Sequence, residues 1–310
     1  MSEIEQASRP VAYLNGELIP FSEARLPVYD LAIMQGASVT ERLRTFRHQP
    51  FQVEQHLSRL HESLRLVGWK NLPNLDGLTE KIHNVCGQNS RLIDPEEDLS
   101  IVIFISAGQG TGDSNGLATN SEPTVCVYST KLPFSRWVDG YKNGTHLVIP
   151  EIRQIPRTSL DPRIKMRSRL HWQIADQIAR EQHPGAMALL LDEHDHLTET
   201  SSGNLMLVKD GVLLTPCEDA TLNGMSRQNV IELCEELEVE LAFQNLTALD
   251  LYQAEEAFLT SSTYCIMPVA TVNGQPIGMA TPGRLTQKLT QMWSEKVDLN
   301  FVAQAIEHRV

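Results

Sequence analysis

The sequence is poor in cysteine, in basic residues and in long apolar stretches. Its 310 residues include five cysteines, none of them in a CxxC pair, so we expect neither a disulfide framework nor a zinc or other metal site. No apolar run approaches the ~20 residues of a membrane span, and the polar segment 1–10 lacks the apolar core of a signal peptide. These shortages predict a reducing, cytoplasmic setting with no membrane partner.

The charge balance is acidic. Lysine and arginine number 26 against 39 aspartates and glutamates, which gives a formal net charge of -13. A field of this sign repels nucleic acid, so we expect no nucleic-acid partner, and an anionic substrate would need a locally basic pocket. With 41% hydrophobic residues, the composition is that of an ordinary globular protein, and the length allows two domains.

Short strands and helices alternate along the chain, which predicts an α+β architecture. Asn15–Gly16 between apolar runs predicts a hairpin. The chain turns irregular over 131–143, and we expect an interdomain linker there, between an N-terminal domain over 1–130 and a C-terminal domain over 144–310. Strands are predicted over 38–46, 100–106, 124–128 and 187–191, hairpins around 209–211 and 271–275, and helices over 55–67, 171–181, 227–237 and 284–293.

A glycine-rich segment, Ala107–Gly116, follows one predicted strand. Its spacing is GxGxG rather than GxGxxG, and no amphipathic helix follows it. A dinucleotide-binding fingerprint needs that helix for its anion site. We therefore interpret the segment as a surface or substrate loop.

Four features indicate chemistry only when they are combined. Alone, Lys165 would be one more surface lysine, Glu199 an ordinary turn carboxylate and Arg59 a helix-surface arginine. The segment Leu222–Arg227 would be a turn followed by a helix start, since a serine there needs no ligand. Their order and spacing favour a different interpretation.

Several separated motifs follow one another in the order typical of an enzyme family. They are Gly36–Glu41, His56-x-x-Arg59–Leu60, the Lys165 segment, Glu199–Asn204 leading into Asp210–Gly211, Leu222-x-Gly224–Met225–Ser226–Arg227, and Phe258–Thr263. In these motifs the chain resembles the class IV aminotransferases, the fold type IV group that contains branched-chain and D-amino-acid enzymes. The resemblance implies an N-terminal α+β domain, a C-terminal α/β pseudo-barrel domain, pyridoxal 5′-phosphate (PLP) as the cofactor, and a homodimer.

The resemblance assigns catalysis to Lys165, which stands at the position of the family lysine. PLP chemistry needs an amine that forms a Schiff base and later moves a proton. The cofactor ring acts as an electron sink when its nitrogen is protonated, which a close carboxylate favours, and Glu199 stands at that position. We expect transfer of an amino group between an amino acid, branched-chain-like or more polar, and a 2-oxo acid.

The cofactor phosphate needs fixed cations and N–H donors. Arg59 matches the family's phosphate arginine, whose planar fork suits phosphate oxygens. Gly224–Met225–Ser226 opens the helix predicted over 227–237, and a helix N-terminus offers free N–H groups and a positive dipole end. The cofactor-binding residues implied by the resemblance are Arg59, Lys165, Glu199, Ser202, Leu222, Met225, Ser226 and Ser262.

The expected substrate residues depart from the family pattern. Gln35 and Thr40 stand where an aromatic pair is usual, and Arg42 stands where a glycine is usual; Thr263 completes the set. Strand alternation puts Arg42 and Arg44 on one face, so we expect the two to act together and to favour a polar or acidic substrate side chain. The alternative is that both arginines are solvated strand residues.

Two other functions remain open on the same scaffold. The serine-rich turn after Glu199, together with Asn223–Gln228, allows a lyase that resembles aminodeoxychorismate lyase. A lyase would release pyruvate without a 2-oxo acid acceptor, whereas an aminotransferase needs one. The altered substrate positions, and Ser168–Arg169 where the family often has a tyrosine or asparagine, allow a non-catalytic PLP binder; retention of both Lys165 and Glu199 argues against it.

Overall fold

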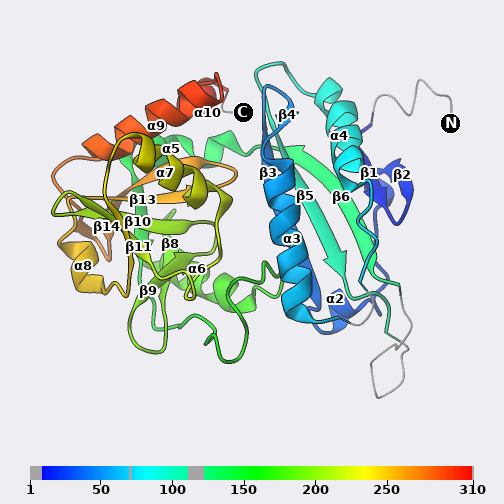
Figure 1. The fold of residues 1–310 in the computed structure, drawn as a ribbon, viewed down its shortest axis with the longest axis horizontal. Coiled ribbons are helices and arrows are strands. Elements are labelled where there is room, and N and C mark those ends of the chain that lie inside the picture. The colour runs from blue at the N-terminus through cyan, green and yellow to red at the C-terminus, as the bar shows by residue number, and fades with distance from the viewer. Residues whose placement is uncertain (1–8, 70–71, 111–121, 309–310) are drawn as a thin grey trace. The chain divides into compact units, whose positions relative to one another are not determined.

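The computed structural model describes residues 9–69, 72–110 and 122–308, which form two compact units (Figure 1). The described parts of Met1–Leu132 and Ile164–Ser168 make the first unit, and those of Pro133–Arg163 and Arg169–Val310 make the second. The sequence placed the boundary at 131–143 and Lys165 in the domain over 144–310. In the structure, the short stretch Ile164–Ser168 is part of the first unit instead. Both units combine sheet and helix, which confirms the α+β prediction.

The first unit is built on an antiparallel six-stranded sheet with the order β2-β1-β6-β5-β3-β4. The predicted hairpin at Asn15–Gly16 joins β1 to β2. β3 has the bounds predicted from the sequence, and it pairs with β5 from Ser38↔Ser106 to Arg44↔Ser100. The strands are β1 (Val11–Leu14), β2 (Glu17–Pro20), β3 (Ser38–Phe46), β4 (Gln49–Pro50), β5 (Leu99–Ser106) and β6 (Thr124–Lys131).

Two helices cover one face of this sheet (Figure 1). α3 (Val53–Val67) packs on β3, and α4 (Leu78–Asn89) packs on β1 and β6. α3 confirms the helix predicted over 55–67 and ends at Gly68, whose φ of 64° lies in the left-handed region that glycine adopts readily. The sequence did not predict α4, although its buried Leu78, Ile82 and Val85 have helical spacing. Shorter helices are η1 (Phe21–Glu23), α2 (Leu31–Met34) and η2 (Ser90–Leu92).

Six strands of the second unit close into a ring, β10-β13-β14-β7-β8-β9, because β9 pairs back with β10. The closing pair is Glu199↔Asn204, so the carboxylate proposed from the sequence lies at the seam of the ring. This closed sheet confirms the expected pseudo-barrel. The strands of the unit are β7 (Thr145–Val148), β8 (Met187–Leu191), β9 (Leu197–Thr200), β10 (Asn204–Lys209), β11 (Val212–Pro216), β12 (Leu241–Gln244), β13 (Glu256–Ser261), β14 (Cys265–Val272) and β15 (Gln275–Pro276).

Helices flank the ring in the second unit. α6 buries Trp172, Ala175 and Ala179 in a cluster with Val148 and Leu190 of the sheet, which explains its apolar side. In the part of the chain that the structure describes, no helix is long and apolar enough to cross a bilayer. The helices are η3 (Phe134–Arg136), α5 (Val138–Asn143), α6 (Leu170–Gln182), α7 (Met225–Glu236), α8 (Ala248–Tyr252), α9 (Arg284–Lys296) and α10 (Phe301–Glu307).

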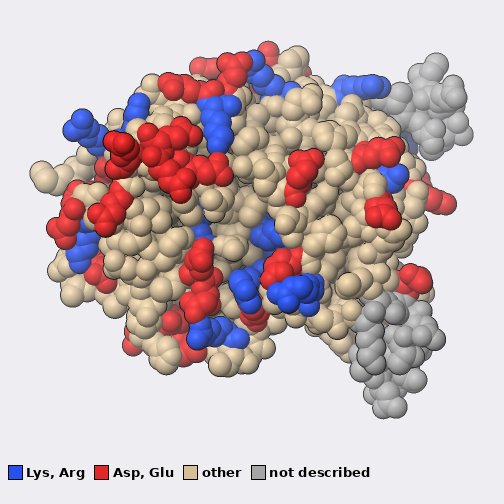
Figure 2. Space-filling model, in the orientation of Figure 1, with Lys and Arg blue, Asp and Glu red and all other residues tan. Residues whose placement is uncertain are grey.

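The acidic excess of the sequence is visible on the surface. Figure 2 shows acidic side chains gathered over the region of α7 and α9, where Glu235 and Glu236 are exposed. Charged side chains at such positions keep their hydration, so this face needs no ligand to explain it. Of the glycine-rich loop, only Ala107–Gly110 is described; residues 111–116 of that prediction lie outside the described ranges.

Candidate active site

Lys165 lies in the extended segment Ile164–Ser168, which runs beside β3. Its carbonyl oxygen accepts a hydrogen bond from the Thr40 N–H at 2.8 Å, and its own N–H donates to Ser63 Oγ on α3 at 3.1 Å. The side chain is half-buried. Because both the N–H and the carbonyl oxygen of Lys165 are hydrogen-bonded, the direction in which its side chain leaves the backbone is fixed.

A buried charge cluster links β3 to α3 in the same unit. Glu41 is fully buried, and its Oε1 accepts from Arg59 Nε at 2.7 Å while its Oε2 accepts from Arg59 Nη2 at 2.8 Å. His56 Nδ1 lies 2.7 Å from the same Oε2. His56 and Arg59 stand three residues apart on α3 and so share one face of the helix. Two nitrogens of the predicted phosphate arginine therefore face Glu41.

The cluster perturbs both of its titrating members. Burial alone would raise the pKa of the Glu41 carboxyl, but the charge and hydrogen bonds of Arg59, helped by His56, hold that pKa well below its usual range. Burial lowers the pKa of the His56 imidazole; Glu41 opposes this shift, and the positive charges of Arg59 and Lys165 add to it. At neutral pH, Glu41 is ionised and His56 is neutral. The influence of Lys165 also means that its amine lies near this cluster.

The polar substrate residues do not share one environment. Gln35 and Arg42 are exposed. The buried Thr40 donates its hydroxyl to the Ile103 carbonyl oxygen at 2.7 Å. Arg44 is buried, 3.7 Å from Asp98, and its guanidinium carbon lies 4.2 Å from the centre of the Phe46 ring. The expectation that Arg42 and Arg44 act together is therefore wrong, because Arg44 is buried beside Asp98 whereas Arg42 is exposed.

Gly36 shows why its motif needs a glycine. Its φ is 68°, and a Cβ there would lie 2.6 Å from Ser168 Oγ. Ser168 Oγ donates to the Gly36 carbonyl oxygen at 2.5 Å. This close approach joins the segment that contains Lys165 to the turn before β3.

In the second unit, Glu199 is held by amide donors. Its Oε2 accepts from Asn204 Nδ2 at 3.1 Å, and its Oε1 accepts from the Leu222 N–H at 3.3 Å. Asn204 Nδ2 also donates to the Leu222 carbonyl oxygen at 2.9 Å. The structure thus brings together two of the predicted cofactor residues, Glu199 and Leu222. Asn204, which binds both, was indicated by the sequence only as the end of the Glu199–Asn204 motif.

Two turns that carry predicted residues lie side by side. Ser202, in the turn after β9, has its Oγ 3.4 Å from the Tyr264 hydroxyl. Tyr264 belongs to the turn between β13 and β14, which also contains Ser262 and Thr263. Burial raises the pKa of Tyr264 to about 12, so the phenol stays protonated. The sequence missed Tyr264; its position directly after the Phe258–Thr263 motif was the available signal.

The first turn of α7 holds two more predicted residues. Gly224 is the N-cap, Met225 begins the helix, and Ser226 is buried. A Cβ on Gly224 would lie 1.9 Å from Asn204 Oδ1, so the helix begins in close contact with the residue that holds Glu199. The N–H groups of a first helical turn are suited to an anion.

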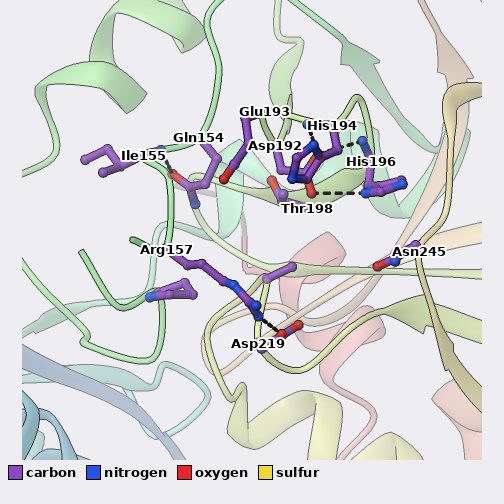
Figure 3. A pocket seen from close by; sticks show the side chains of 12 residues that line it. Gln154, Ile155, Arg157, Asp192, Glu193, His194, His196, Thr198, Asp219 and Asn245 are labelled. Atoms are coloured by element: carbon purple, nitrogen blue, oxygen red, sulfur yellow. Dashed lines mark hydrogen bonds and ion pairs between the residues drawn. The ribbon is translucent and has the colours of Figure 1, made fainter. Parts of the chain in front are cut away.

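A polar pocket of about 200 Å³, open to solvent, lies elsewhere in the second unit. Figure 3 shows Asp192, His194 and His196, from the turn between β8 and β9, on one side of it and the Arg157–Asp219 ion pair on the other. None of the cofactor residues predicted from the sequence lines it. Thr198 does, and strand alternation puts that residue on the opposite face of β9 from Glu199.

The family model "Amino-transferase class IV" matches residues 38–272. The chain belongs to the class IV aminotransferases. These enzymes are PLP-dependent and act on amino and oxo acids, so the family, the enzyme class and the cofactor expected from the sequence are confirmed.

The chain is also similar, at low sequence identity, to named branched-chain aminotransferases. The class IV aminotransferase chain is 25% identical over 90% of its length to the branched-chain-amino-acid aminotransferase of Escherichia coli, and it spans 90% of that protein. It is 25% identical to branched-chain-amino-acid aminotransferase-like protein 1 of Arabidopsis thaliana, of which it spans about half, 51%. A solved structure of the T.th. branched-chain amino acid aminotransferase with pyridoxamine 5′-phosphate matches with a TM-score of 0.83 at 26% identity, covering 93% of this chain and 94% of the other.

The side chains of this aminotransferase fit PLP in their chemistry. The first unit offers the Lys165 amine for the aldehyde and the guanidinium of Arg59 for an anion. The second unit offers the Glu199 carboxylate for a protonated ring nitrogen, and the first turn of α7 with Ser226 for the phosphate. Within each unit these groups lie at adjoining elements. Their roles toward the cofactor stay predictions.

Proposed function

We propose that this class IV aminotransferase moves an amino group between an amino acid and a 2-oxo acid, with Lys165 as the catalytic amine. The observation that carries the proposal is the fixed backbone of Lys165, which is bonded to Thr40 and Ser63 on two different elements. PLP, when bound, supplies the aldehyde that accepts the amino group and the ring that takes up electrons from the substrate. Lys165 would hold the cofactor through its amine and would move the proton of the substrate α-carbon.

The residues around the cofactor divide into two groups by chemistry. Glu199 would face the ring nitrogen of the cofactor. For the phosphate, the first unit would offer the cation of Arg59, and the second unit would offer the first turn of α7. The remaining cofactor residues, Ser202, Leu222, Met225, Ser226 and Ser262, would add hydroxyl and backbone donors. Supporting this division, Glu199 is oriented by hydrogen bonds from Asn204 and Leu222, and α7 begins at Met225, close to these residues.

The amino-acid substrate is branched-chain-like or more polar. The relatives are branched-chain enzymes, and one solved structure at 25% identity is complexed with N-(5′-phosphopyridoxyl)-L-glutamate. An acidic donor such as L-glutamate would suit the cation of the exposed Arg42, whereas Gln35 and Thr263 would provide polar contacts. Thr40 contributes little, since its hydroxyl is bonded to a carbonyl oxygen.

The decisive experiment is the visible spectrum of the protein purified with PLP. We expect a band in the wild type that disappears in Lys165→Ala and persists in Lys131→Ala, a control lysine whose ammonium is paired with Glu97 at 2.6 Å. Turnover should need both an amino donor and a 2-oxo acid acceptor. An unchanged band in Lys165→Ala would refute the proposal, and release of pyruvate without an acceptor would favour the lyase.

We also propose a homodimer. Val28, Tyr29, Ile33 and Met34 form an exposed apolar patch on and before α2, and patches of this kind mark association surfaces. The molar mass in solution should equal two chains, and Ile33→Glu should lower it. A monomeric wild type at micromolar concentration would refute this part of the proposal.

A further inference from the structure

Arg227 is a buried cation whose contacts lie in the loop before its own helix. The side chain is 2% exposed, which is rare for an arginine. Its Nη1 donates to Thr221 Oγ1 at 2.9 Å and its Nη2 donates to Asn223 Oδ1 at 2.6 Å. Its guanidinium carbon lies 5.4 Å from the centre of the Phe243 ring. From the first turn of α7, Arg227 thus binds the residues on both sides of Leu222.

Leu222 connects this arginine to Glu199. The Leu222 N–H donates to Glu199 Oε1 at 3.3 Å, and the Leu222 carbonyl oxygen accepts from Asn204 Nδ2 at 2.9 Å. The loop is therefore held at its side chains by Arg227 and at its backbone by Asn204 and Glu199. Neither Thr221 nor Asn223 can move without moving the amide that faces the carboxylate.

We propose that Arg227 is a positioning residue that aligns the Glu199 carboxylate and the start of α7 together. This inference rests on the proposed function, in which Glu199 faces the cofactor ring and α7 faces the phosphate. Because Arg227 belongs to the first turn of α7 and binds the loop that contacts Glu199, one side chain couples the two ends of the cofactor site. Truncating it removes two charge-assisted hydrogen bonds, and both ends of the site should loosen together.

The planar fork of arginine is the feature that this role requires. Two separate nitrogens reach Thr221 and Asn223 at once, which a single ammonium cannot do with the same geometry. Arg227→Lys should therefore restore the charge but only part of the function. Asn223→Ala removes one partner while leaving the arginine in place, so it tests the same contact if Arg227→Met folds poorly.

The experiment measures PLP binding and the pH titration of the bound-cofactor absorption band. We expect Arg227→Met to weaken PLP binding by about 10- to 100-fold, the range of a lost hydrogen bond to a charged group, and to shift the midpoint of the band titration. Arg227→Lys and Asn223→Ala should shift both quantities in the same direction by less. The control is Leu147→Ala, a fully buried residue of β7, which should lower the melting temperature and leave the band titration unchanged.

The outcomes separate this inference from the proposed function. Folded Arg227→Met and Asn223→Ala proteins with the wild-type PLP affinity and band titration would overturn the role of Arg227. A shift of the same size in Leu147→Ala would also overturn it, because general loosening would then suffice. Failure of the wild type to show any lysine-dependent band would refute the proposed function itself.

Discussion

Two carboxylates, one in each unit, are held in opposite ways. Glu41 is fully buried and accepts two hydrogen bonds from the guanidinium of Arg59, at 2.7 and 2.8 Å. Glu199 is half-buried and accepts from neutral amides, those of Asn204 and Leu222, at 3.1 and 3.3 Å. A guanidinium compensates the charge of the first carboxylate inside the fold, whereas the second accepts hydrogen bonds from two amide groups.

Both glutamates belong to motifs of the aminotransferase family, and this difference suits them to different tasks. A salt bridge cancels most of the electric field that a carboxylate exerts on more distant groups. Glu41 is therefore suited to hold α3 against β3 and to orient Arg59. The amide donors of Asn204 and Leu222 orient Glu199, which fits the role proposed for it toward a protonated ring nitrogen. Glu41 is therefore suited to a structural task, whereas Glu199 is the carboxylate that we propose faces the cofactor.

Neutralising each carboxylate in turn is the strongest test of this difference. Glu41→Gln leaves Arg59 buried without its counter-charge, and we expect a loss of about 3–5 kcal/mol in the free energy of unfolding. Glu199→Gln keeps its shape and a hydrogen-bonding oxygen, and we expect a loss of about 1 kcal/mol together with weakened turnover. Urea denaturation measures the first effect and steady-state kinetics the second. Equal destabilisation by the two variants would contradict the distinction.

Lowering the pH tests the Glu41 cluster without a substitution at Glu41 or Glu199. The pKa values of Glu41 and His56 are both lowered in the folded protein, so the unfolded chain binds more protons. The stability from His56 is complete above its unfolded pKa of about 6.5 and is lost as the pH falls toward its folded value. The stability from Glu41 declines only below about pH 4.3.

The variant that isolates this effect is His56→Gln. It should flatten the pH dependence of the unfolding free energy between about pH 6.5 and 5, where one proton contributes at most about 1.4 kcal/mol per pH unit, and keep the later decline due to Glu41. Leu147→Ala, a substitution at a buried and non-titrating residue of β7, serves as the control and should leave the slope unchanged. A wild-type stability that stays level from pH 7 to pH 5 would show that His56 does not titrate as its surroundings require.

The sequence predicted local elements well because their signals are local. The Asn15–Gly16 hairpin and the bounds of β3 and β8 follow from turn chemistry and from the residue types of the strands. Barrel closure was expected only from the family resemblance, since the Glu199↔Asn204 pair that makes it leaves no periodic pattern. Helix α4 had the right spacing, but no capping residue marked its start.

For the site, the sequence predicted residue types better than contacts. Glu41, Asn204 and Arg227 appeared only as parts of motifs. Glu41 binds Arg59, Asn204 binds Glu199, and Arg227 binds Thr221, the neighbour of Leu222. Such roles depend on which elements pack together, which spacing along one chain does not encode. The transfer of Ile164–Ser168 to the first unit was missed for the same reason.

The smallest expected effect concerns Arg42, the neighbour of Glu41 on β3. Its N–H donates to Glu41 Oε2 at 3.2 Å, but its side chain is exposed, so Arg42→Ala should change the unfolding free energy by no more than about 0.5 kcal/mol. If the guanidinium attracts an acidic substrate, kcat/KM for glutamate should fall several-fold relative to that for leucine. An unchanged ratio of kcat/KM values would show that Arg42 does not belong to the substrate site. Of this pair, only Glu41 would then contribute, by stabilising the fold.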